Sequence, residues 1–308
     1  MKQHPDLSAY GIDSHWLRER AADHRLLVIY AHPDDESFGN AGTIARYSAA
    51  GAEVHYACAT RGERGTVKPE MLAGYADIAE LRTAELLAAA KAMAMDSVHF
   101  LGYCDSGMEN TADNQNPDCL VQANPERVAG QLVALIRALR PQVIITFPPY
   151  GGYGHPDHIA IHHAALAAWE AAADAKRFPE QQAVGLAPWQ PQKLYFSTFG
   201  VGMLKLALLG MRLLRKDPRK VGANNDIDLV KVAENVTPIT AEVPVGAHLA
   251  ARDKAWLAHR SQLGGMGLMM RLPIWLRRLL PNKEAFTRVQ PPLGAGAARE
   301  RDLFSGVR

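Results

Sequence analysis

The stretch LLVIYAHPDDES, residues 26–37, decides the fold of this 308-residue chain. Its first part, Leu26 to His32, is a continuous apolar run, which is typical of a strand buried on both faces of a parallel sheet. Pro33 then fixes a turn, and a helix is expected to start a few residues further on. A strand, a turn and a helix in this order predict the first unit of an α/β fold.

The same alternation continues outward from this stretch. Strand-like runs lie at residues 53–60, 97–103, 142–149 and 193–199, and helix-like stretches lie at 40–52, 71–95, 125–139 and 156–173. Strand–helix–strand units at this spacing predict a mostly parallel sheet flanked by helices. In such sheets ligands bind in the loops beyond the carboxyl ends of the strands.

Beyond Gly200 the pattern loosens. Residues 227–243 predict one or two further strands and residues 245–262 a helix, so that 1–262 form the domain and 263–308 an extension packed on it. The segments 200–218 and 264–281 are apolar with interspersed Arg and Lys. A core or oligomer face is the simpler interpretation, and a lid over an apolar pocket or a membrane-touching surface is the alternative.

The composition excludes several classes of protein. Apolar residues make up 48% of the chain, charged residues 21%, and the net charge is +2, so nothing indicates a nucleic-acid partner. Three cysteines without a C-x-x-C motif predict a reducing compartment and no disulfides. The polar N-terminus lacks a signal-peptide core and no apolar run is long enough to span a bilayer, so a cytoplasmic protein is expected.

A first group of candidate functional residues, His32, Asp34 and Asp35, follows the first strand. Histidine and carboxylate are a good pair of zinc ligands, and zinc hydrolases commonly use three protein ligands and leave a position for water. The adjacent carboxylates point in different directions in a turn, so one can bind a metal while the other faces the metal's water. The alternative is a turn whose aspartates cap the first helix.

A second group follows the fourth strand in PPYGGYGHPDHIAIHH, residues 148–163. Its glycines let the loop pass close to a ligand, although the dinucleotide fingerprint G-x-G-x-x-G is absent. His155 and His158 are three residues apart across a helix start and can face one pocket, while the spacing of His158 and His162 also suits two ligands. Four histidines in nine residues favour a functional role over ordinary surface or core positions.

The two groups are expected to form one metal site, because both follow strands that end at the same edge of the sheet. Two ligands would come from the first loop and a third from the later one. A zinc ion lowers the pKa of a bound water to about 7. A nearby carboxylate would take the proton of that water, and a histidine opposite would stabilise the oxyanion. These groups suit the hydrolysis of an amide.

Together these residues resemble the PIG-L or LmbE-like family of zinc-dependent N-deacetylases. That family acts on N-acetylglucosamine conjugates, including those of mycothiol and bacillithiol biosynthesis, and includes a mycothiol-conjugate amidase. The resemblance rests on AHPDDES (31–37), TRGERG (60–65), LRTAEL (81–86), DSGM (105–108), GGYGHPDH (151–158) and LAHRSQ (257–262), in the family order. ERDLFSG, residues 300–306, is similar to a common family ending. The resemblance implies a Rossmann-like, LmbE-like α/β fold with a C-terminal elaboration.

The resemblance also implies a role for each matched residue. His32, Asp35 and His158 would be the metal ligands, and Asp34 would be the general base. His155 would stabilise the oxyanion and protonate the leaving amine, with Asp157 orienting it.

Four further residues match positions at the substrate. They are Arg82, Asp105 and Tyr153, which would contact the sugar or the developing oxyanion, and Glu63 as a further pocket residue. Plainer interpretations stay open: a surface ion pair of Arg82 with Glu80 or Glu85, a turn capped by Asp105, and Tyr153 packed on glycines. His162 as a fourth ligand, or in place of His158, is also open. His259 matches a recurrent late histidine to which the sequence gives no role.

The sequence therefore predicts a zinc-dependent enzyme that removes the acetyl group from an N-acetylglucosamine-type conjugate, releasing acetate and a free amine. The alternatives are an amidase of mycothiol-type thiol conjugates and a metal-stabilised sugar-binding module without turnover. His/Asp sites also accept Fe²⁺, Mn²⁺ or Co²⁺ in place of Zn²⁺. The expected partner is a small amino-sugar substrate, a homo-oligomer is compatible with the apolar segments, and membrane contact is the less favoured alternative.

Overall fold

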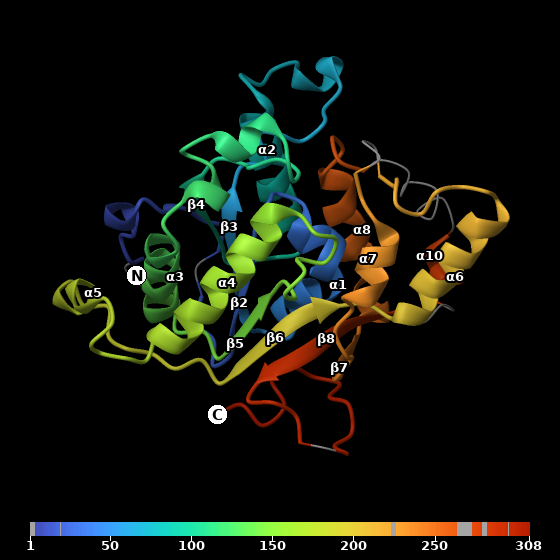
Figure 1. The fold of residues 1–308 in the computed structure, drawn as a ribbon. Coiled ribbons are helices and arrows are strands. Elements are labelled where there is room, and N and C mark those ends of the chain that lie inside the picture. Colours follow the sequence, from blue (N-terminus) through green and yellow to red (C-terminus); the bar gives the residue numbers. More distant parts are fainter. Residues whose placement is uncertain (1–3, 19, 223–225, 264–272, 279–281, 295) are drawn as a thin grey trace.

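A single eight-stranded sheet forms the centre of the computed structural model, with the strand order β1-β4-β3-β2-β5-β6-β8-β7 (Figure 1). The structure describes residues 4–18, 20–222, 226–263, 273–278, 282–294 and 296–308. The strands are β1 Asp13–Trp16, β2 Arg25–Tyr30, β3 Glu53–Thr60, β4 Ser97–Tyr103, β5 Val143–Thr146, β6 Lys193–Thr198, β7 Ala241–Pro244 and β8 Lys283–Gln290.

The five central strands of the sheet are parallel, as the sequence predicts. β2 pairs in parallel with β3 on one side and with β5 on the other. Outer parallel pairs join β3 to β4 and β5 to β6. The chain thus proceeds outward from β2 in one direction and then from β5 in the other, which places the topological switch point between these two strands.

The edges of the sheet were predicted only in part, since one or two strands were expected within residues 227–243, where β7 begins at Ala241, and β1 and β8 were not expected. β1 pairs antiparallel with β4, and β8 pairs antiparallel with both β6 and β7. The tail that follows β8 packs on α1: the Tyr47 hydroxyl of that helix donates to the Asp302 carboxylate and accepts from the backbone N–H of Leu303. Residues after position 262 therefore contribute a strand and a tail to the same sheet, while the proposed boundary at 262 itself stays a prediction.

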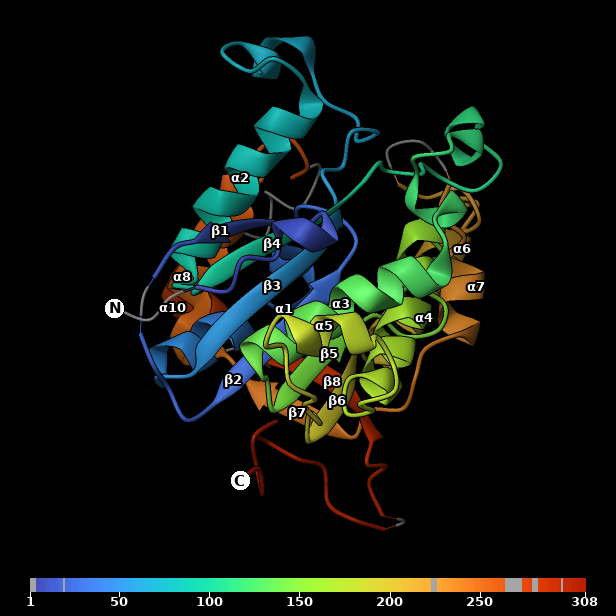
Figure 2. The same cartoon turned by 90° about the vertical axis from the view of Figure 1, so that its left-hand side faces the viewer.

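Helices cover both faces of the sheet (Figure 2). On one face lie α1 Asp35–Ala49, α2 Ile78–Ala92 and α8 Leu249–Ala258, and on the other lie α3 Pro125–Leu139 and α4 Pro156–Ala171. The other described helices are α5 Pro179–Ala183, α6 Val201–Leu213, α7 Leu229–Glu234 and α10 Ile274–Arg277. Short 3₁₀ turns are η1 Ser8–Tyr10, η2 Pro69–Leu72, η3 Ala112–Gln115, η4 Leu120–Gln122 and η5 Gly246–His248.

Capping side chains explain where two helices begin. The second helix was expected from residue 71, but it starts at Ile78 because the Asp77 carboxylate accepts the N–H of Glu80 at 2.8 Å. The β-branched stretch after Asp228 was expected to be a strand. It forms α7 instead, because Asp228 accepts the N–H groups of Val230 and Lys231. Local capping outweighs residue propensity at both places.

The apolar basic segment 200–218 forms α6, which projects from the side of the molecule (Figure 1). Its leucines do not form a core, since Leu206, Leu209 and Leu213 are 68%, 54% and 76% exposed. The second such segment, 264–281, lies outside the described residues except for 273–278. Among the described helices, none is both long and apolar enough to cross a membrane.

Candidate functional site

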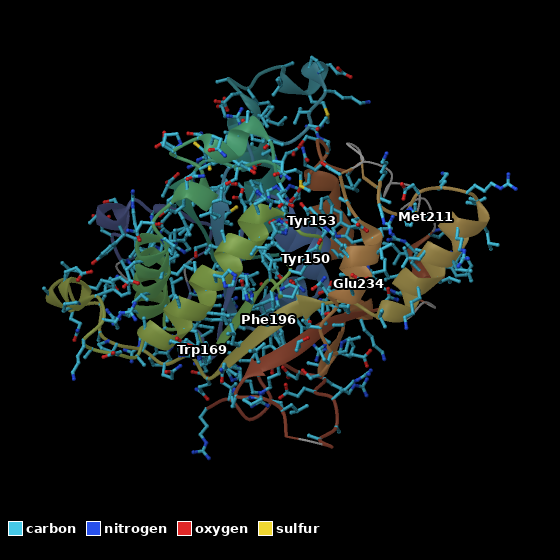
Figure 3. All side chains as sticks on the ribbon, in the orientation of Figure 1. Tyr150, Tyr153, Trp169, Phe196, Met211 and Glu234 are labelled. Carbon is cyan, nitrogen blue, oxygen red and sulfur yellow. The ribbon has the colours of Figure 1, made fainter. Side chains whose placement is uncertain are left out.

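The predicted site residues gather at the carboxyl ends of the central strands. His32 and Asp35 follow β2, and the loop that leads to α4 follows β5, so the two groups meet at the switch point of the sheet. Figure 3 shows Tyr150 and Tyr153 in that loop, at the end of α4 opposite to Trp169. The ligand atoms of His32, His155 and His158 lie within 4.8 Å of one another.

The three proposed ligands form a triangle. His32 Nδ1 lies 3.1 Å from His158 Nε2. Asp35 Oδ2 lies 3.6 Å from His32 Nδ1, and Asp35 Oδ1 lies 3.3 Å from His158 Nε2. Four-coordinate zinc, with ligands at 2.0–2.1 Å, holds neighbouring donors about 3.3 Å apart. The two histidine nitrogens are thus separated as neighbouring donors of such an ion would be, and each has an oxygen of Asp35 at a similar distance.

The outer contacts of the two histidines also suit a metal. His158 Nδ1 lies 2.8 Å from the Gly151 carbonyl, and His32 Nε2 lies 3.1 Å from the Asp157 carboxylate. Carbonyls and carboxylates only accept hydrogen bonds, so these two ring nitrogens carry the protons. In the neutral rings the facing nitrogens, His32 Nδ1 and His158 Nε2, then carry lone pairs beside the Asp35 carboxylate, an arrangement that a bound cation or a proton on His32 stabilises.

The negative surroundings of His32 act in the same direction. Burial alone lowers the pKa of His32, yet Asp105, together with Asp157 and Asp35, raises it well above the ordinary value. The same carboxylates would stabilise a bound cation at this place. A second group of possible ligands adds Asp105, His155 and Asp157 to His32, and its two carboxylates lie on the Nε2 side of the His32 ring.

Hydrogen bonds already occupy the carboxylates of this second group. Asp157 accepts from the hydroxyl and the backbone N–H of Ser106 as well as from His32. Asp105 accepts from the backbone N–H groups of Gly107 and Arg64 at 2.8 and 3.3 Å. The Nδ1 side of His32, beside Asp35 and His158, is therefore the candidate place for a metal.

The partner of Asp157 corrects an expectation from the sequence. Asp157 was expected to orient His155, but its carboxylate contacts His32 and Ser106 instead. The contact with His155 comes from the backbone, because the Asp157 N–H donates to His155 Nδ1 at 3.2 Å. The reason is that His155 is the N-cap of α4, which turns its ring onto the first helical N–H groups.

His155 is held ready to donate a hydrogen bond. Its Nδ1 accepts from the backbone, so the proton of the neutral ring sits on Nε2. Burial, reinforced by the nearby His32 and His158, lowers the pKa of His155 to about 2. Edge-on packing of Tyr153, with ring centroids 6.0 Å from His155 and 4.9 Å from His158, covers these rings.

Asp34 adopts a strained backbone at the start of α1, with φ 122° and ψ −27°. A non-glycine residue in such a region costs roughly 1–3 kcal/mol. Asp34 occupies the N-cap position, but its side chain makes no capping bond, which contradicts the plain interpretation of the DD pair as a cap. Its Oδ2 instead accepts from Arg82 Nη2 at 3.0 Å. Burial raises the pKa of Asp34 to about 6, against the opposing effect of Arg82.

Arg82 is therefore not a surface residue. Its side chain is 4% exposed, and it also donates to the carbonyls of Pro33 at 2.6 Å and Gly62 at 2.8 Å. Two glycines of the TRGERG motif make room for it. A Cβ atom on Gly62 would lie 2.1 Å from Arg82 Nη1, and one on Gly65 would lie 2.7 Å from it. Gly62 also has a φ of 69°, which favours glycine.

Asp105 supports the site from the loop after β4, and Glu63 supports it from the loop after β3. The plain interpretation of Asp105 as a turn residue is correct in part, because its Oδ1 accepts from Gly107. The same oxygen lies 3.6 Å from His32 Nε2, so Asp105 faces the site as well. Glu63 accepts the backbone N–H of Asp105 at 3.0 Å. Whether these residues also contact a substrate stays a prediction.

Two histidines outside the triangle have other partners. His162 Nδ1 lies 2.8 Å from the Phe147 carbonyl, and its ring packs against Phe196, so it is not placed with the proposed ligands. His259 Nε2 contacts Glu36 Oε1 at 2.7 Å, and both side chains are fully buried. The sequence analysis missed Ser106 and Glu36. Ser106 lies in the motif DSGM and Glu36 in the motif AHPDDES, and this membership is the feature of the sequence that could have indicated them.

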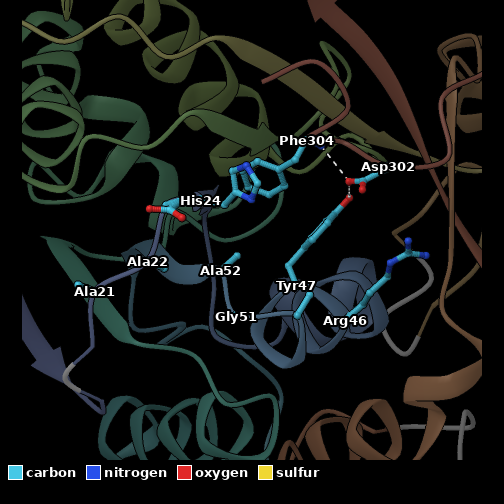
Figure 4. A pocket seen from close by; sticks show the side chains of 11 residues that line it. Ala21, Ala22, His24, Arg46, Tyr47, Gly51, Ala52, Asp302 and Phe304 are labelled. Carbon is cyan, nitrogen blue, oxygen red and sulfur yellow. Dashed lines mark hydrogen bonds between the residues drawn. The ribbon is translucent and has the colours of Figure 1, made fainter. Parts of the chain in front are cut away.

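A separate hollow lies away from this site (Figure 4). It has a volume of about 460 Å³ and is lined by the segment before β2, the end of α1 and the C-terminal tail. Tyr47, Asp302 and Phe304 form one wall of it. None of the predicted site residues lines this hollow, which opens near the amino end of β2.

Fold and site together define an α/β protein with a candidate metal centre at the switch point of its sheet. A family model described as PIG-L, GlcNAc-PI de-N-acetylase, matches residues 27–169. The 1D-myo-inositol 2-acetamido-2-deoxy-alpha-D-glucopyranoside deacetylase of Streptomyces avermitilis is 38% identical, and the match covers 92% of this chain and 98% of the relative. The chain belongs to the PIG-L family.

Two solved structures show the same fold. The N,N'-diacetylchitobiose deacetylase of Pyrococcus horikoshii has a TM-score of 0.57 at 18% identity, covering 86% of this chain and 83% of its own. The 4-carboxy-2-hydroxymuconate hydratase of Pseudomonas putida has a TM-score of 0.56 at 18% identity, covering 89% and 100%. Their names differ in chemistry, so the fold alone does not decide the activity.

Proposed function

We propose that the protein is a metal-dependent deacetylase that hydrolyses the N-acetyl group of an N-acetylglucosamine conjugate of the inositol type. The products are acetate and a free amine. The observation that carries the proposal is the convergence of His32, Asp35 and His158 beside Asp34, in a chain 38% identical to a relative with that named activity. We propose zinc as the ion, because two histidines and one carboxylate are a ligand set that zinc hydrolases use.

When bound, the metal would polarise the acetyl carbonyl and activate a water molecule for attack. Asp34 accepts the proton of the attacking water, and Arg82 fixes the direction of its carboxylate. His155 donates a hydrogen bond from Nε2 to the oxygen that becomes negatively charged, and the proton that Asp34 takes from the water passes to the leaving amine. Asp157 and Ser106 keep His32 in the tautomer that leaves Nδ1 free to bind.

For the substrate we propose contacts with Arg82, Asp105, Tyr153 and Glu63. The proposed contact of Tyr153 is supported by its position, since its ring lies in the glycine-rich loop beside the rings of His155 and His158. Arg82 is engaged by Asp34 and two carbonyls, so we assign it to the support of the base more than to the sugar. A cytoplasmic location and a homo-oligomer stay predictions.

The decisive experiment separates deacetylation from amidase activity and from binding without turnover. Purified protein is depleted of metal, reloaded with zinc, and offered a glucosaminyl-inositol carrying the N-acetyl group, with acetate as the readout. A mycothiol-type thiol conjugate is tested in parallel, with cleavage of its amide as the readout. Asp34→Asn is expected to abolish turnover with one metal ion still bound. Full activity without metal, or in His32 and Asp35 variants, would contradict the proposal.

A further inference from the structure

The motif LAHRSQ, residues 257–262, is left without a role by the chemistry described so far. It begins in the last turn of α8, which packs against both α1 and α2 (Figure 2). Those two helices carry Asp34 at the start of α1 and Arg82 within α2. The motif therefore lies where a few side chains can contact both supports of the proposed base.

His259 reaches the base through one intermediate residue. Its Nε2 lies 2.7 Å from Oε1 of Glu36, and both side chains are fully buried. The other carboxylate oxygen of Glu36 accepts the backbone N–H of Asp34 at 3.0 Å. Glu36 thus connects His259 to the backbone of Asp34, the residue whose φ of 122° needs support from its surroundings.

Ser261 makes the corresponding contact on α2. Its backbone N–H and its hydroxyl donate to the two carboxylate oxygens of Glu85, at 2.9 and 2.6 Å. Glu85 is buried and lies one helical turn after Arg82. The same motif thus holds the first turn of α1 through His259 and the Arg82 region of α2 through Ser261.

One feature argues against packing as the only role of His259. Its Nδ1 is buried and has no hydrogen-bond partner among the described residues. Leaving a polar atom unpaired in the interior costs free energy, and an apolar side chain of similar size would avoid this cost. The presence of a histidine at position 259 is therefore explained by the Nε2–H group that it donates to the Glu36 carboxylate.

We propose that His259 and Ser261 are positioning residues that fix Asp34 and Arg82 relative to each other, His259 by way of Glu36 and Ser261 by way of Glu85. This inference rests on the proposed function, in which Asp34 is the base. It assigns the late motif to the geometry of proton transfer, and not to metal binding or to contact with the sugar.

The test compares His259→Leu, which removes the donor, with His259→Gln, whose amide N–H can replace Nε2–H. His248→Gln, at the opposite end of α8, is the matched control, and Ser261→Ala tests the second contact. In metal-loaded enzyme we expect kcat of His259→Leu to fall at least about tenfold with KM within about twofold. His259→Gln should recover most of that loss, Ser261→Ala should lower kcat less, and His248→Gln should match the wild type.

Amide hydrogen exchange gives a second readout that needs no activity. Exchange in residues 33–38 should accelerate in His259→Leu but not in His248→Gln, because the Asp34 N–H loses its fixed acceptor. Unchanged kcat and unchanged exchange in His259→Leu would overturn the inference. If His259→Leu does not fold, Ser261→Ala and His259→Gln are compared with the wild type instead. In that case, wild-type kcat and wild-type exchange around Arg82 in Ser261→Ala would overturn the inference. A wild type without deacetylase activity would refute the proposed function, and the exchange data would still judge the contacts.

Discussion

The guanidinium of Arg82 donates to the carboxylate of Asp34 at 3.0 Å and to the carbonyl of Pro33 at 2.6 Å. One side chain from α2 thus holds both the strained turn after β2 and the carboxylate that this turn presents. Asp34 keeps 16% of its side chain exposed, while Arg82 keeps 4%. The base is therefore reachable, whereas the group that directs it is enclosed by protein.

Replacing Arg82 by methionine should lower both activity and stability. The change leaves a poorly solvated carboxylate without its partner, which typically costs about 3 kcal/mol of unfolding free energy. We expect kcat/KM to fall roughly 100-fold, because Asp34 is no longer held in place. Urea denaturation and deacetylation rates measure the two effects.

Arg177→Met is the control for this prediction. Arg177 pairs with Glu126 at 2.7 Å, but its side chain is 43% exposed and that of Glu126 is 60% exposed. Exposed pairs of this kind contribute about 0.5 kcal/mol. Equal losses of stability and activity in the two variants would show that the position of Arg82 is unimportant.

Gly62→Ala should impair the enzyme through Arg82. The added Cβ would lie 2.1 Å from Arg82 Nη1, so the guanidinium must move. Gly185→Ala is the matched control, because Gly185 has a similar positive φ of 88° and nothing within 4 Å of the added atom. Both variants should lose roughly 1–2 kcal/mol to the unfavourable φ. Only Gly62→Ala should lose activity, and wild-type kcat/KM in it would contradict the argument.

The sequence was sufficient for the part of the fold that carries the site. The buried runs at β2 and β5 are apolar enough to predict central parallel strands, and such strands end at one edge of the sheet. That reasoning alone brings His32 and His158 together across 126 positions of the chain. His32, Asp35 and His158, which the family resemblance implied as ligands, lie 3.1–3.6 Å from one another, and their binding of a metal stays a prediction.

The rest depends on contacts that a pattern along the chain does not contain. β1 has four residues and β8 is only half-buried, so neither shows the periodicity of a strand. Asp157 follows His155 by two residues, which suggested that the two side chains pair. As the N-cap of α4, however, His155 binds the backbone N–H of Asp157, while the Asp157 carboxylate contacts His32. The partners of Glu36 and Glu85 come from a motif more than 170 positions away.

Zinc binding should stabilise the protein, and the effect should depend on His158 but not on His162. Both histidines are buried on α4, and each has its Nδ1 on a backbone carbonyl. Asparagine can keep that hydrogen bond while it removes Nε2, so His158→Asn and His162→Asn form a matched pair. At an ion concentration 100 times Kd, binding stabilises the folded state by about 2.7 kcal/mol. Thermal unfolding with and without zinc should show this stabilisation by zinc in His162→Asn and not in His158→Asn. Loss of the stabilisation in His162→Asn would implicate His162 as a ligand.

Glu284, on β8, should stabilise α1. The helix is interrupted at Asn40, whose φ of −142° is not helical. The Glu284 carboxylate accepts the N–H groups of Gly42 and Thr43 just after the interruption, at 2.9 and 2.7 Å. It thus acts as an N-cap supplied by β8.

Glu284→Gln places an amide N–H group against one of these backbone N–H groups, so the cap is half lost. We expect a loss of about 1 kcal/mol in unfolding free energy, measured by urea denaturation. Glu242→Gln is the control, since the ion pairs of Glu242 on β7 within the described part of the chain are with the exposed Lys283 and Arg299, at 3.5 and 3.3 Å. The kcat of Glu284→Gln should stay within about twofold of the wild type, because the interruption at Asn40 separates this cap from Asp34. Equal stability of the two variants would show that α1 does not need the carboxylate.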